Sequence, residues 1–276
     1  MTTAAREDQL ASLDGRLCRA GEASISVLDD GLLRGDGAFE FVRCYLGKPF
    51  TLGEHLDRLQ RSCALIRLDC PRDAVEAEIA ALMAAMGPLN RDLRVVLTRG
   101  GRRILLTEPY VDHGPARLAF VTDQPRPLLV GAKSLSYAAN MLAKRIAGER
   151  GFEEALLTTP DGLVMEVQQA AFFWVDAEGV LCTPPLSEGI LDSITRRVVM
   201  RRLAVEEHAC GTHEALAARE AFLAGSAREI HPVGTIEDRV FAEVPGPLTR
   251  RAEEAYWDEV EDTLGFARAQ VESAGF

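Results

Sequence analysis

A proline-rich break near the middle of the chain constrains the fold more than any other feature. Residues 123–127 read Asp-Gln-Pro-Arg-Pro, and two prolines within three residues disfavour both a helix and a central strand. The pattern of expected elements changes across this break. We therefore predict an N-terminal α/β domain over residues 1–122, an interdomain linker over 123–130 and a C-terminal domain over 131–276.

The N-terminal half mixes short strands with amphipathic helices. Apolar residues recur at helical spacing in 52–66, and Asp73 is positioned to cap a helix that runs to Met86. Segments rich in strand-forming residues predict strands at 16–19, 38–42, 93–98, 104–107 and 117–122. The strands at 93–98 and 104–107 are expected to form a hairpin with Arg-Gly-Gly-Arg-Arg at its tip.

The C-terminal half predicts helices separated by a series of strands. A helix is expected over 137–150, with Ala138, Met141, Leu142 and Ile146 on its apolar face. Turn signals at 160–162 and 176–179 separate strands, further strands are expected at 221–223 and 230–233, and helices are expected over 194–209 (capped by Ser193) and 248–271. Because strands and helices do not alternate regularly, the order favours an α+β fold.

Composition excludes several classes of function. The 276 residues carry a net charge of −11, which argues against nucleic-acid binding. No apolar run is long enough to span a membrane, and no signal-peptide pattern is visible. The six cysteines are scattered without metal-ligand spacing, so we predict no metal site and reduced thiols in the cytoplasm.

Lys133 lies between Gly131 and a serine-rich turn, just before a predicted helix. A lysine can act as a nucleophile when burial or nearby cations lower the pKa of its amine. Taken alone, Lys133 also fits an ordinary surface lysine.

Glu166 lies in the otherwise apolar strand sequence Leu-Val-Met-Glu-Val. Strand alternation places it on the same face as Val164, and a half-buried carboxylate needs a partner such as a pyridinium N–H. The alternative is an edge strand with Glu166 facing solvent.

Three further places suit an anion. The turn into the helix at Ile194 and Thr195 presents unpaired N–H groups and a hydroxyl, and the small-residue turn at Ser226 and Ala227 is a second candidate. Arg58 can supply a permanent positive charge. Each also has a plain structural explanation, as a capped helix, a strand connection or a solvated helix face.

Taken in order, these motifs resemble the fold-type IV pyridoxal-phosphate enzymes, which include branched-chain aminotransferases, D-amino-acid aminotransferases and aminodeoxychorismate lyases. The resemblance covers nearly the whole chain. The residues that carry it lie at 34–40, 54–59, 133–135, 151–156, 161–166, 183–186, 194–196 and 225–233.

The resemblance implies a small N-terminal α/β domain, a larger C-terminal domain with a β-barrel-like core, and pyridoxal 5′-phosphate between them, usually in a homodimer. It implies that Lys133 bonds to the cofactor and moves the substrate Cα proton, and that Glu166 pairs with the pyridine nitrogen. Tyr137 is expected at the phenolic oxygen, and Phe39 and Ala227 in the substrate pocket. The expected phosphate ligands are Arg58, Ile194, Thr195 and Ser226.

Substrate-carboxylate recognition is less sharply indicated. Arg99, Arg102 and Arg103 lie at the hairpin tip, where D-amino-acid enzymes carry an arginine followed by a histidine that is absent here. Solvated arginines on a plain turn are the alternative. Arg43 resembles an arginine of branched-chain enzymes. The chain departs from the common pattern at Val167, Ala171 and Ser193, where the family usually carries Gly, Asn and Gly.

We therefore predict an aminotransferase that uses a small-molecule amino donor, with hydrophobic or branched-chain amino acids favoured, and a 2-keto acid acceptor. A D-amino-acid or (R)-amine transaminase and a 4-amino-4-deoxychorismate lyase are the alternatives. The lyase is disfavoured because Glu40 and Phe41 occupy places where lyases carry hydroxyl residues. A cofactor-binding protein without turnover is the third possibility.

Overall fold

The structure is a computed structural model that describes residues 9–111, 114–122 and 127–275. The chain divides into two compact units, and neither is continuous in sequence. Unit 1 consists of Met1–Val111, Ala132–Tyr137 and Val260–Phe276, and unit 2 consists of Asp112–Gly131 and Ala138–Glu259.

This division differs from the predicted boundaries in three places. The strand at 116–122 belongs to unit 2, because it pairs with strands of that unit on both sides. Residues 132–137, which include Lys133, belong to unit 1, and so does the end of the chain. Residues 123–126 of the predicted linker lie outside the described residues.

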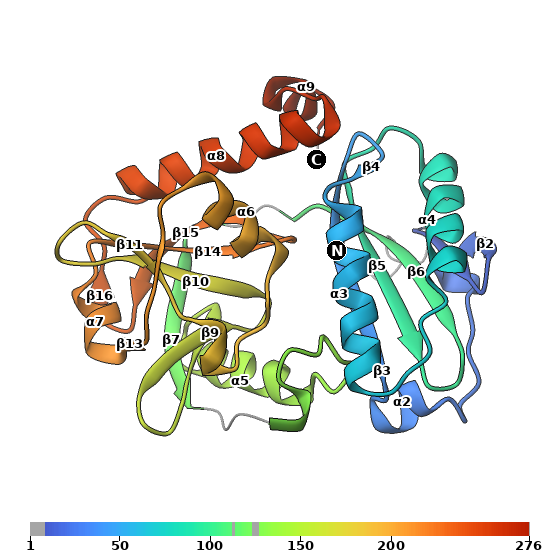
Figure 1. The fold of residues 1–276 in the computed structure, drawn as a ribbon, viewed down its shortest axis with the longest axis horizontal. Helices are drawn as coiled ribbons and strands as arrows, with labels where there is room; N and C mark the ends of the chain where they lie inside the picture. Colours follow the sequence, from blue (N-terminus) through green and yellow to red (C-terminus); the bar gives the residue numbers. More distant parts are fainter. Residues whose placement is uncertain (1–8, 112–113, 123–126, 276) are drawn as a thin grey trace. The chain divides into compact units, whose positions relative to one another are not determined.

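Unit 1 is built on a six-stranded sheet with the order β2-β1-β6-β5-β3-β4 among the described residues (Figure 1). Its strands are β1 (Leu10–Leu13), β2 (Arg16–Arg19), β3 (Gly37–Tyr45), β4 (Lys48–Pro49), β5 (Arg91–Thr98) and β6 (Arg103–Pro109). Its helices are η1 (Ala20–Glu22), α2 (Asp30–Arg34), α3 (Leu52–Leu65), α4 (Arg72–Met86) and α9 (Arg268–Ser273).

One face of this sheet forms the core of unit 1. Alternation along β3 puts Ala38, Val42 and Cys44 on the face that α3 and α4 cover. The helices contribute apolar stripes that include Leu59 and Ile79. The predicted capping role of Asp73 is wrong. The helix begins at Arg72 with Pro71 at the N-cap position, and Asp73 lies in the first turn, where a carboxylate is favourable.

Unit 2 is a closed barrel with peripheral strands and helices. The strands β10, β14, β15, β7, β8 and β9 pair in that order, and β9 pairs again with β10, which closes the barrel. Their bounds are β7 (Ala116–Thr122), β8 (Glu154–Thr158), β9 (Leu163–Val167), β10 (Ala170–Val175), β14 (Glu220–Gly225) and β15 (Glu229–Ile236). The predicted α+β fold with a barrel-like C-terminal domain is confirmed.

The remaining elements lie outside this closed ring of strands. They are η2 (Pro127–Leu129), α5 (Ala138–Glu149), β11 (Leu181–Thr183), η3 (Leu186–Glu188), α6 (Ile194–Arg202), β12 (Glu206–Glu207), β13 (Cys210–Gly211), α7 (Thr212–Ala217), β16 (Arg239–Val240) and α8 (Pro247–Leu264). None of the helices in the described part of the chain has the length and apolar character needed to cross a membrane.

A bulge in β9 changes the predicted facing of Glu166. Leu156 of β8 pairs with Val167 and Thr158 pairs with Val164, so β9 contains one extra residue. Both valines therefore point into the barrel core. Glu166 pairs with Ala171, whose neighbours Ala170 and Phe172 fill the core. The expected shared face of Val164 and Glu166 is wrong, because the bulge interrupts the alternation.

Two predicted helices are shorter than expected. The helix that follows Ser193 ends at Arg202 rather than at residue 209, because the chain then pairs with β11 and β9 as the short strands β12 and β13. The last predicted helix is broken at Gly265, whose φ of +75° turns the chain from α8 towards α9.

The apolar face predicted for α5 is also wrong. The helix buries Ala143 and Ala147 against the barrel, because small side chains allow close approach. The larger Met141, Leu142 and Ile146 are exposed.

Candidate active site

Lys133 lies on a short segment that extends the sheet of unit 1. The Phe39 N–H donates to the Lys133 carbonyl at 2.9 Å, and the Leu135 N–H donates to the Gly37 carbonyl at 2.9 Å. An antiparallel bridge joins Ala38 to Ser134. Residues 132–137 therefore run beside the start of β3, which fixes the backbone of Lys133.

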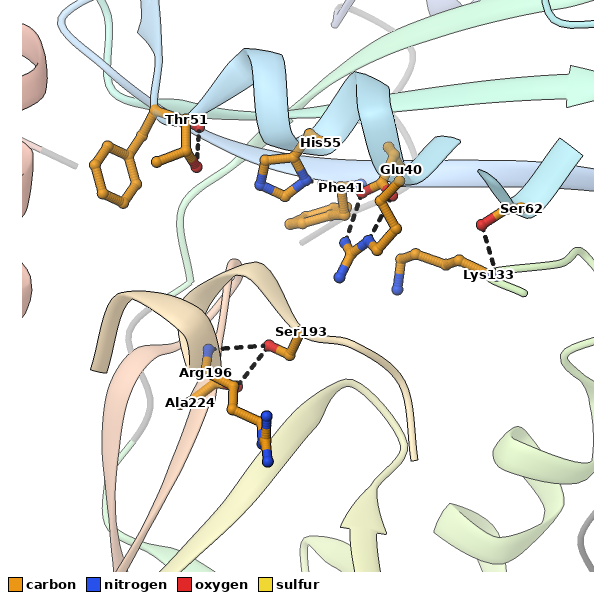
Figure 2. Close-up of polar contacts among 11 residues, drawn as sticks. Glu40, Phe41, Thr51, His55, Ser62, Lys133, Ser193, Arg196 and Ala224 are labelled. Atoms are coloured by element: carbon orange, nitrogen blue, oxygen red, sulfur yellow. Dashed lines mark hydrogen bonds and ion pairs between the residues drawn. The ribbon is translucent and has the colours of Figure 1, made fainter. Parts of the chain in front are cut away.

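Contacts with both α3 and β3 place Lys133. Its backbone N–H donates to Ser62 Oγ at 3.0 Å (Figure 2). Its Nζ lies 4.5 Å from the centroid of the Phe39 ring, a distance at which the ring attracts a cation. Tyr137 meets the same ring edge-on, with centroids 5.5 Å apart. Unit 1 thus brings together Lys133, Phe39 and Tyr137, three of the predicted site residues.

Arg58 is buried in the same unit and is held by a buried carboxylate. Its Nε donates to Glu40 Oε1 and its Nη2 to Glu40 Oε2, both at 2.7 Å. The exposed fractions are 4% for Arg58 and 0% for Glu40. A paired, side-on contact of this kind fixes the plane of the guanidinium as well as its position.

His55 completes this buried group. Its Nδ1 lies 2.8 Å from Glu40 Oε2 (Figure 2). Burial alone would raise the pKa of Glu40, but the Arg58 charge and the hydrogen bonds from Arg58 and His55 hold it well below its usual range. Burial lowers the pKa of His55, and the Arg58 and Lys133 charges lower it further, although Glu40 opposes them.

Sequence reasoning missed Glu40 and His55 as part of the site. A signal was nevertheless present: β3 alternation places Glu40 on the helix-facing side between Ala38 and Val42, where a carboxylate needs a partner. His55 and Arg58 are three residues apart on α3, and so lie on one helix face. Together these spacings predict the contact.

In unit 2, Glu166 is half-buried and is oriented by the backbone. The Leu191 N–H donates to Glu166 Oε1 at 3.1 Å. Leu191 lies in the segment that leads into α6, so this bond ties the carboxylate to the beginning of that helix.

Ile194 and Thr195 form the first turn of α6, and both are buried. The preceding Ser193 is the N-cap, and its Oγ accepts from the Arg196 N–H at 3.3 Å. The same Oγ lies 3.5 Å from the Ala224 carbonyl at the end of β14 (Figure 2). Ser193 therefore works as a cap and links the N-terminus of α6 to the adjacent turn.

Ser226 and Ala227 lie in the turn between β14 and β15, and both are partly buried. Gly225 precedes them because a Cβ there would lie 2.7 Å from the Gln169 carbonyl oxygen. Residues 191–193 contact both Glu166 and Ala224. Unit 2 thus gathers Glu166, the start of α6 and the 225–228 turn.

The three arginines of the hairpin tip all have intramolecular partners. Arg99 binds the Asp36 carboxylate and the carbonyls of Ile66 and Arg67. Arg102 pairs with Asp14 and Arg103 with Glu78, each at 2.7 Å.

Arg43 is also held inside unit 1. It is 1% exposed, its Nε lies 3.2 Å from Asp92 Oδ1, and its guanidinium carbon lies 4.5 Å from the centroid of the Tyr110 ring. A substrate role for any of these four arginines stays a prediction.

No group of three or more His, Cys, Asp or Glu with the arrangement of a metal site occurs in the described ranges. All six cysteines carry free thiols.

The family model for amino-transferase class IV matches residues 37–236 of the chain. A Methanocaldococcus jannaschii protein, whose name proposes it as a branched-chain-amino-acid aminotransferase, is 33% identical over 89% of this chain and 94% of its own. The D-alanine aminotransferase of Bacillus licheniformis is 30% identical over 90% of this chain and 95% of its own.

Solved structures agree with these relatives. The branched-chain aminotransferase of Thermoproteus uzoniensis, solved with norvaline, has a TM-score of 0.80 and 32% identity over 93% of this chain and 95% of its own. The T.th. branched-chain amino acid aminotransferase, solved with pyridoxamine 5′-phosphate, has a TM-score of 0.84 and 26% identity over 96% of both chains.

Proposed function

Because the chain belongs to the class IV aminotransferases, we propose that it moves an amino group between a hydrophobic amino acid, branched-chain favoured, and a 2-keto acid. The similarity to a branched-chain enzyme solved with norvaline, an unbranched hydrophobic amino acid, supports this choice of donor.

The setting of Lys133 is the observation that carries the proposal. Lys133 is half-buried, and its amine lies over the Phe39 ring in the unit that also buries the cationic Arg58. A solvated surface lysine would have neither an aromatic wall nor a backbone fixed on both sides by β3 and α3. This setting suits an amine that must react in a defined direction.

The residues fit pyridoxal 5′-phosphate by their chemistry. Lys133 offers an amine for the aldehyde, and Glu166 offers an oriented carboxylate for the pyridine nitrogen. The phosphate would take the Arg58 cation, the N-terminus of α6 at Ile194 and Thr195, and the turn at Ser226. The relative solved with pyridoxamine 5′-phosphate supports the same cofactor here.

When bound, this cofactor supplies an aldehyde that links to amines and a ring that accepts electrons from the substrate Cα. Lys133 would remove the proton from the substrate Cα and pass it to the cofactor. Glu166 would hold a proton at the ring nitrogen, and Tyr137 would donate to the phenolic oxygen. Phe39 and Ala227 would bound the space for the substrate side chain.

We further propose that the protein is a cytoplasmic homodimer. Each of the six cysteines has a free thiol, which agrees with a reducing compartment. Large apolar residues are exposed on α5 and around α2, which suggests surfaces that a second copy covers; they are Val27, Leu28, Leu32, Leu33, Met141, Leu142 and Ile146.

A D-amino-acid transaminase is the second candidate, because a D-alanine aminotransferase is nearly as similar as the branched-chain relatives. The two candidates differ in the hand of the amino acid that they accept.

The test is a half-reaction screen of the cofactor-loaded protein. Single-enantiomer amino acids and 1-phenylethylamine are added one at a time, and loss of the cofactor's absorption band is followed. We expect L-valine, L-leucine and L-isoleucine to react and Lys133→Ala to be inactive.

Reaction with D-alanine alone would favour the second candidate. Pyruvate release from aminodeoxychorismate without a keto acceptor would favour the lyase. If Lys133→Ala kept its turnover, the proposal would be wrong.

A further inference from the structure

Glu40, His55 and Arg58 form a buried group of polar side chains that the packing of α3 on β3 does not require. Glu40 lies on the helix-facing side of β3, between Ala38 and Val42, which belong to the apolar core of unit 1. An apolar residue at position 40 would serve packing at least as well, since replacing a buried ion pair by matched apolar residues is often neutral or stabilising.

The contacts of Glu40 fix one edge of the Arg58 guanidinium. Oε1 accepts from Nε, and Oε2 accepts from Nη2, so the carboxylate takes two of the five N–H groups and sets the plane of the fork. Without this carboxylate, the guanidinium of an arginine on α3 could adopt several orientations, because its side chain has several rotatable bonds.

His55 fixes the carboxylate in turn. Because ionised Glu40 can only accept hydrogen bonds, the contact at 2.8 Å means that His55 Nδ1 carries a proton and donates it. The Phe41 N–H donates to the same Oε2 at 3.3 Å. Both oxygens of Glu40 are therefore held, and the carboxylate cannot rotate without losing bonds.

The charge of Glu40 makes its presence informative. A carboxylate beside an arginine repels a phosphate that the arginine is meant to bind, and so on charge alone it weakens the site. Such a carboxylate is useful if holding the guanidinium in one orientation stabilises the bound phosphate by more than the repulsion costs.

We propose that Glu40 and His55 are positioning residues that orient Arg58 towards the phosphate group of the cofactor. This inference rests on the proposed function, since it assigns the phosphate of pyridoxal 5′-phosphate to Arg58. It adds that phosphate recognition in unit 1 depends on a three-residue chain, in which His55 holds Glu40 and Glu40 holds Arg58.

The experiment compares two probes that differ only in the phosphate. The full chain is freed of cofactor and titrated with pyridoxal 5′-phosphate and with pyridoxal, following the absorption change when the aldehyde bonds to the protein. The ratio of the two dissociation constants reports the contribution of the phosphate group. A variant that merely loosens the fold weakens both probes alike and leaves this ratio unchanged.

We expect Glu40→Gln to lower the phosphate preference by about tenfold or more, the order of the affinity loss when the residue that orients a metal ligand is removed. We expect His55→Leu to lower it by roughly threefold, since one hydrogen bond is lost. His55→Asn, whose amide can donate from near the Nδ1 position, should restore it.

The matched control is Glu78→Gln. Glu78 is also a buried glutamate of unit 1 that pairs with an arginine at 2.7 Å, but its partner is Arg103. This variant should keep the wild-type preference. The double variant Glu40→Gln/Arg58→Met removes both charges. Its loss of phosphate preference is the largest that can be attributed to Arg58.

Four outcomes would overturn the inference: an unchanged preference in Glu40→Gln, a stronger phosphate preference, a loss greater than in the double variant, or an equal loss in Glu78→Gln. If Glu40→Gln does not fold, the variants His55→Leu and His55→Asn decide. An unchanged phosphate preference in His55→Leu would then contradict the proposed link from His55 through Glu40 to Arg58. If the wild type binds neither probe, the proposed function itself fails, which is a separate result.

Discussion

His55 is a buried imidazole whose titration should be visible in the stability of unit 1. Burial and the Arg58 and Lys133 charges lower its pKa from the ordinary 6.5. Below pH 6.5 the unfolded chain therefore binds a proton that the folded chain does not, so stability falls as the pH falls, by at most about 1.4 kcal/mol per pH unit for this group.

We expect the protection of β3 and α3 against amide hydrogen exchange to decrease between pH 7 and pH 5.5 in the wild type, after correction for intrinsic exchange rates. His55→Asn removes the titration and keeps a donor for Glu40, so its protection should change less over the same range. Equal pH dependence in both proteins would contradict the assignment. Protonation of Glu40 also lowers the stability as the pH falls, but only below pH 4.5, the ordinary pKa of a glutamate.

At this scale, motif spacing predicted which side chains lie near one another better than it predicted their hydrogen-bond and ion-pair partners. Lys133, Phe39 and Tyr137 lie together in the structure, and so do Glu166 and the turns of unit 2. The side-chain contacts of Arg99 and Arg43 could not be predicted, because their carboxylate partners Asp36 and Asp92 are distant in sequence or lie on a neighbouring strand.

At the scale of the elements, the sequence predicted the helices and strands whose apolar and turn residues follow the expected local pattern. The strand Arg16–Arg19 and the β5–β6 hairpin lie where they were expected, because turn residues bound them. The prediction for α5 failed because the helix approaches the barrel through alanines, which carry little periodic signal. The facing of Glu166 failed because a bulge depends on the neighbouring strand.

The start of α8 depends on a carboxylate from another element. Glu220 of β14 accepts from the N–H groups of Leu248 and Thr249 at 3.0 and 2.9 Å and from Thr249 Oγ1 at 2.7 Å. Gly246 allows this approach, because a Cβ there would collide with the Glu220 carboxylate. A buried carboxylate at a helix N-terminus both satisfies orphan N–H groups and favours the dipole.

We expect Glu220→Ala to lower the free energy of unfolding of unit 2 by about 2–3 kcal/mol, because it leaves buried donors without a partner. Glu220→Gln should cost about half as much. Urea unfolding followed by tryptophan fluorescence measures this directly, since both tryptophans, Trp174 and Trp257, lie in unit 2. The control is Glu254→Gln on the exposed face of α8; an equal loss there would contradict the capping role.

At the scale of the whole molecule, the chain returns to unit 1 at its C-terminal end. The side chain of Asn90 holds this return: its Nδ2 donates to the carbonyls of Val271 and Gly275 at 2.9 and 2.7 Å, and its Oδ1 accepts from the Leu46 N–H at 2.9 Å. Asn90 is 2% exposed. One buried amide therefore connects three parts of the chain within one unit.

We expect Asn90→Ala to release α9, so that the amides of this helix exchange hydrogen at least about tenfold faster. The reason is that the carbonyls of Val271 and Gly275 lose their donor and the Leu46 N–H loses its acceptor. Lys48→Ala is the control, since Lys48 reaches the Leu264 carbonyl only from an exposed position at 3.4 Å. Unchanged exchange in α9 of Asn90→Ala would show that apolar contacts, such as those of the buried Val271, hold the helix alone.

The proposed homodimer makes a prediction about α5, which buries alanines and exposes larger apolar side chains. Leu142 is 54% exposed, and Met141 and Ile146 are each 36% exposed. Placing the larger apolar groups in water while small ones face the core is unfavourable for a monomer, unless a partner covers them. We expect Leu142→Lys to shift the molar mass measured by light scattering from dimer towards monomer. Glu149→Gln, which adds the same unit of charge at the exposed end of α5, should leave the dimer intact. A wild-type monomer would contradict the proposed homodimer. A Leu142→Lys variant that stays fully dimeric would remove α5 from the interface and leave the exposed leucines around α2 as the surface to test.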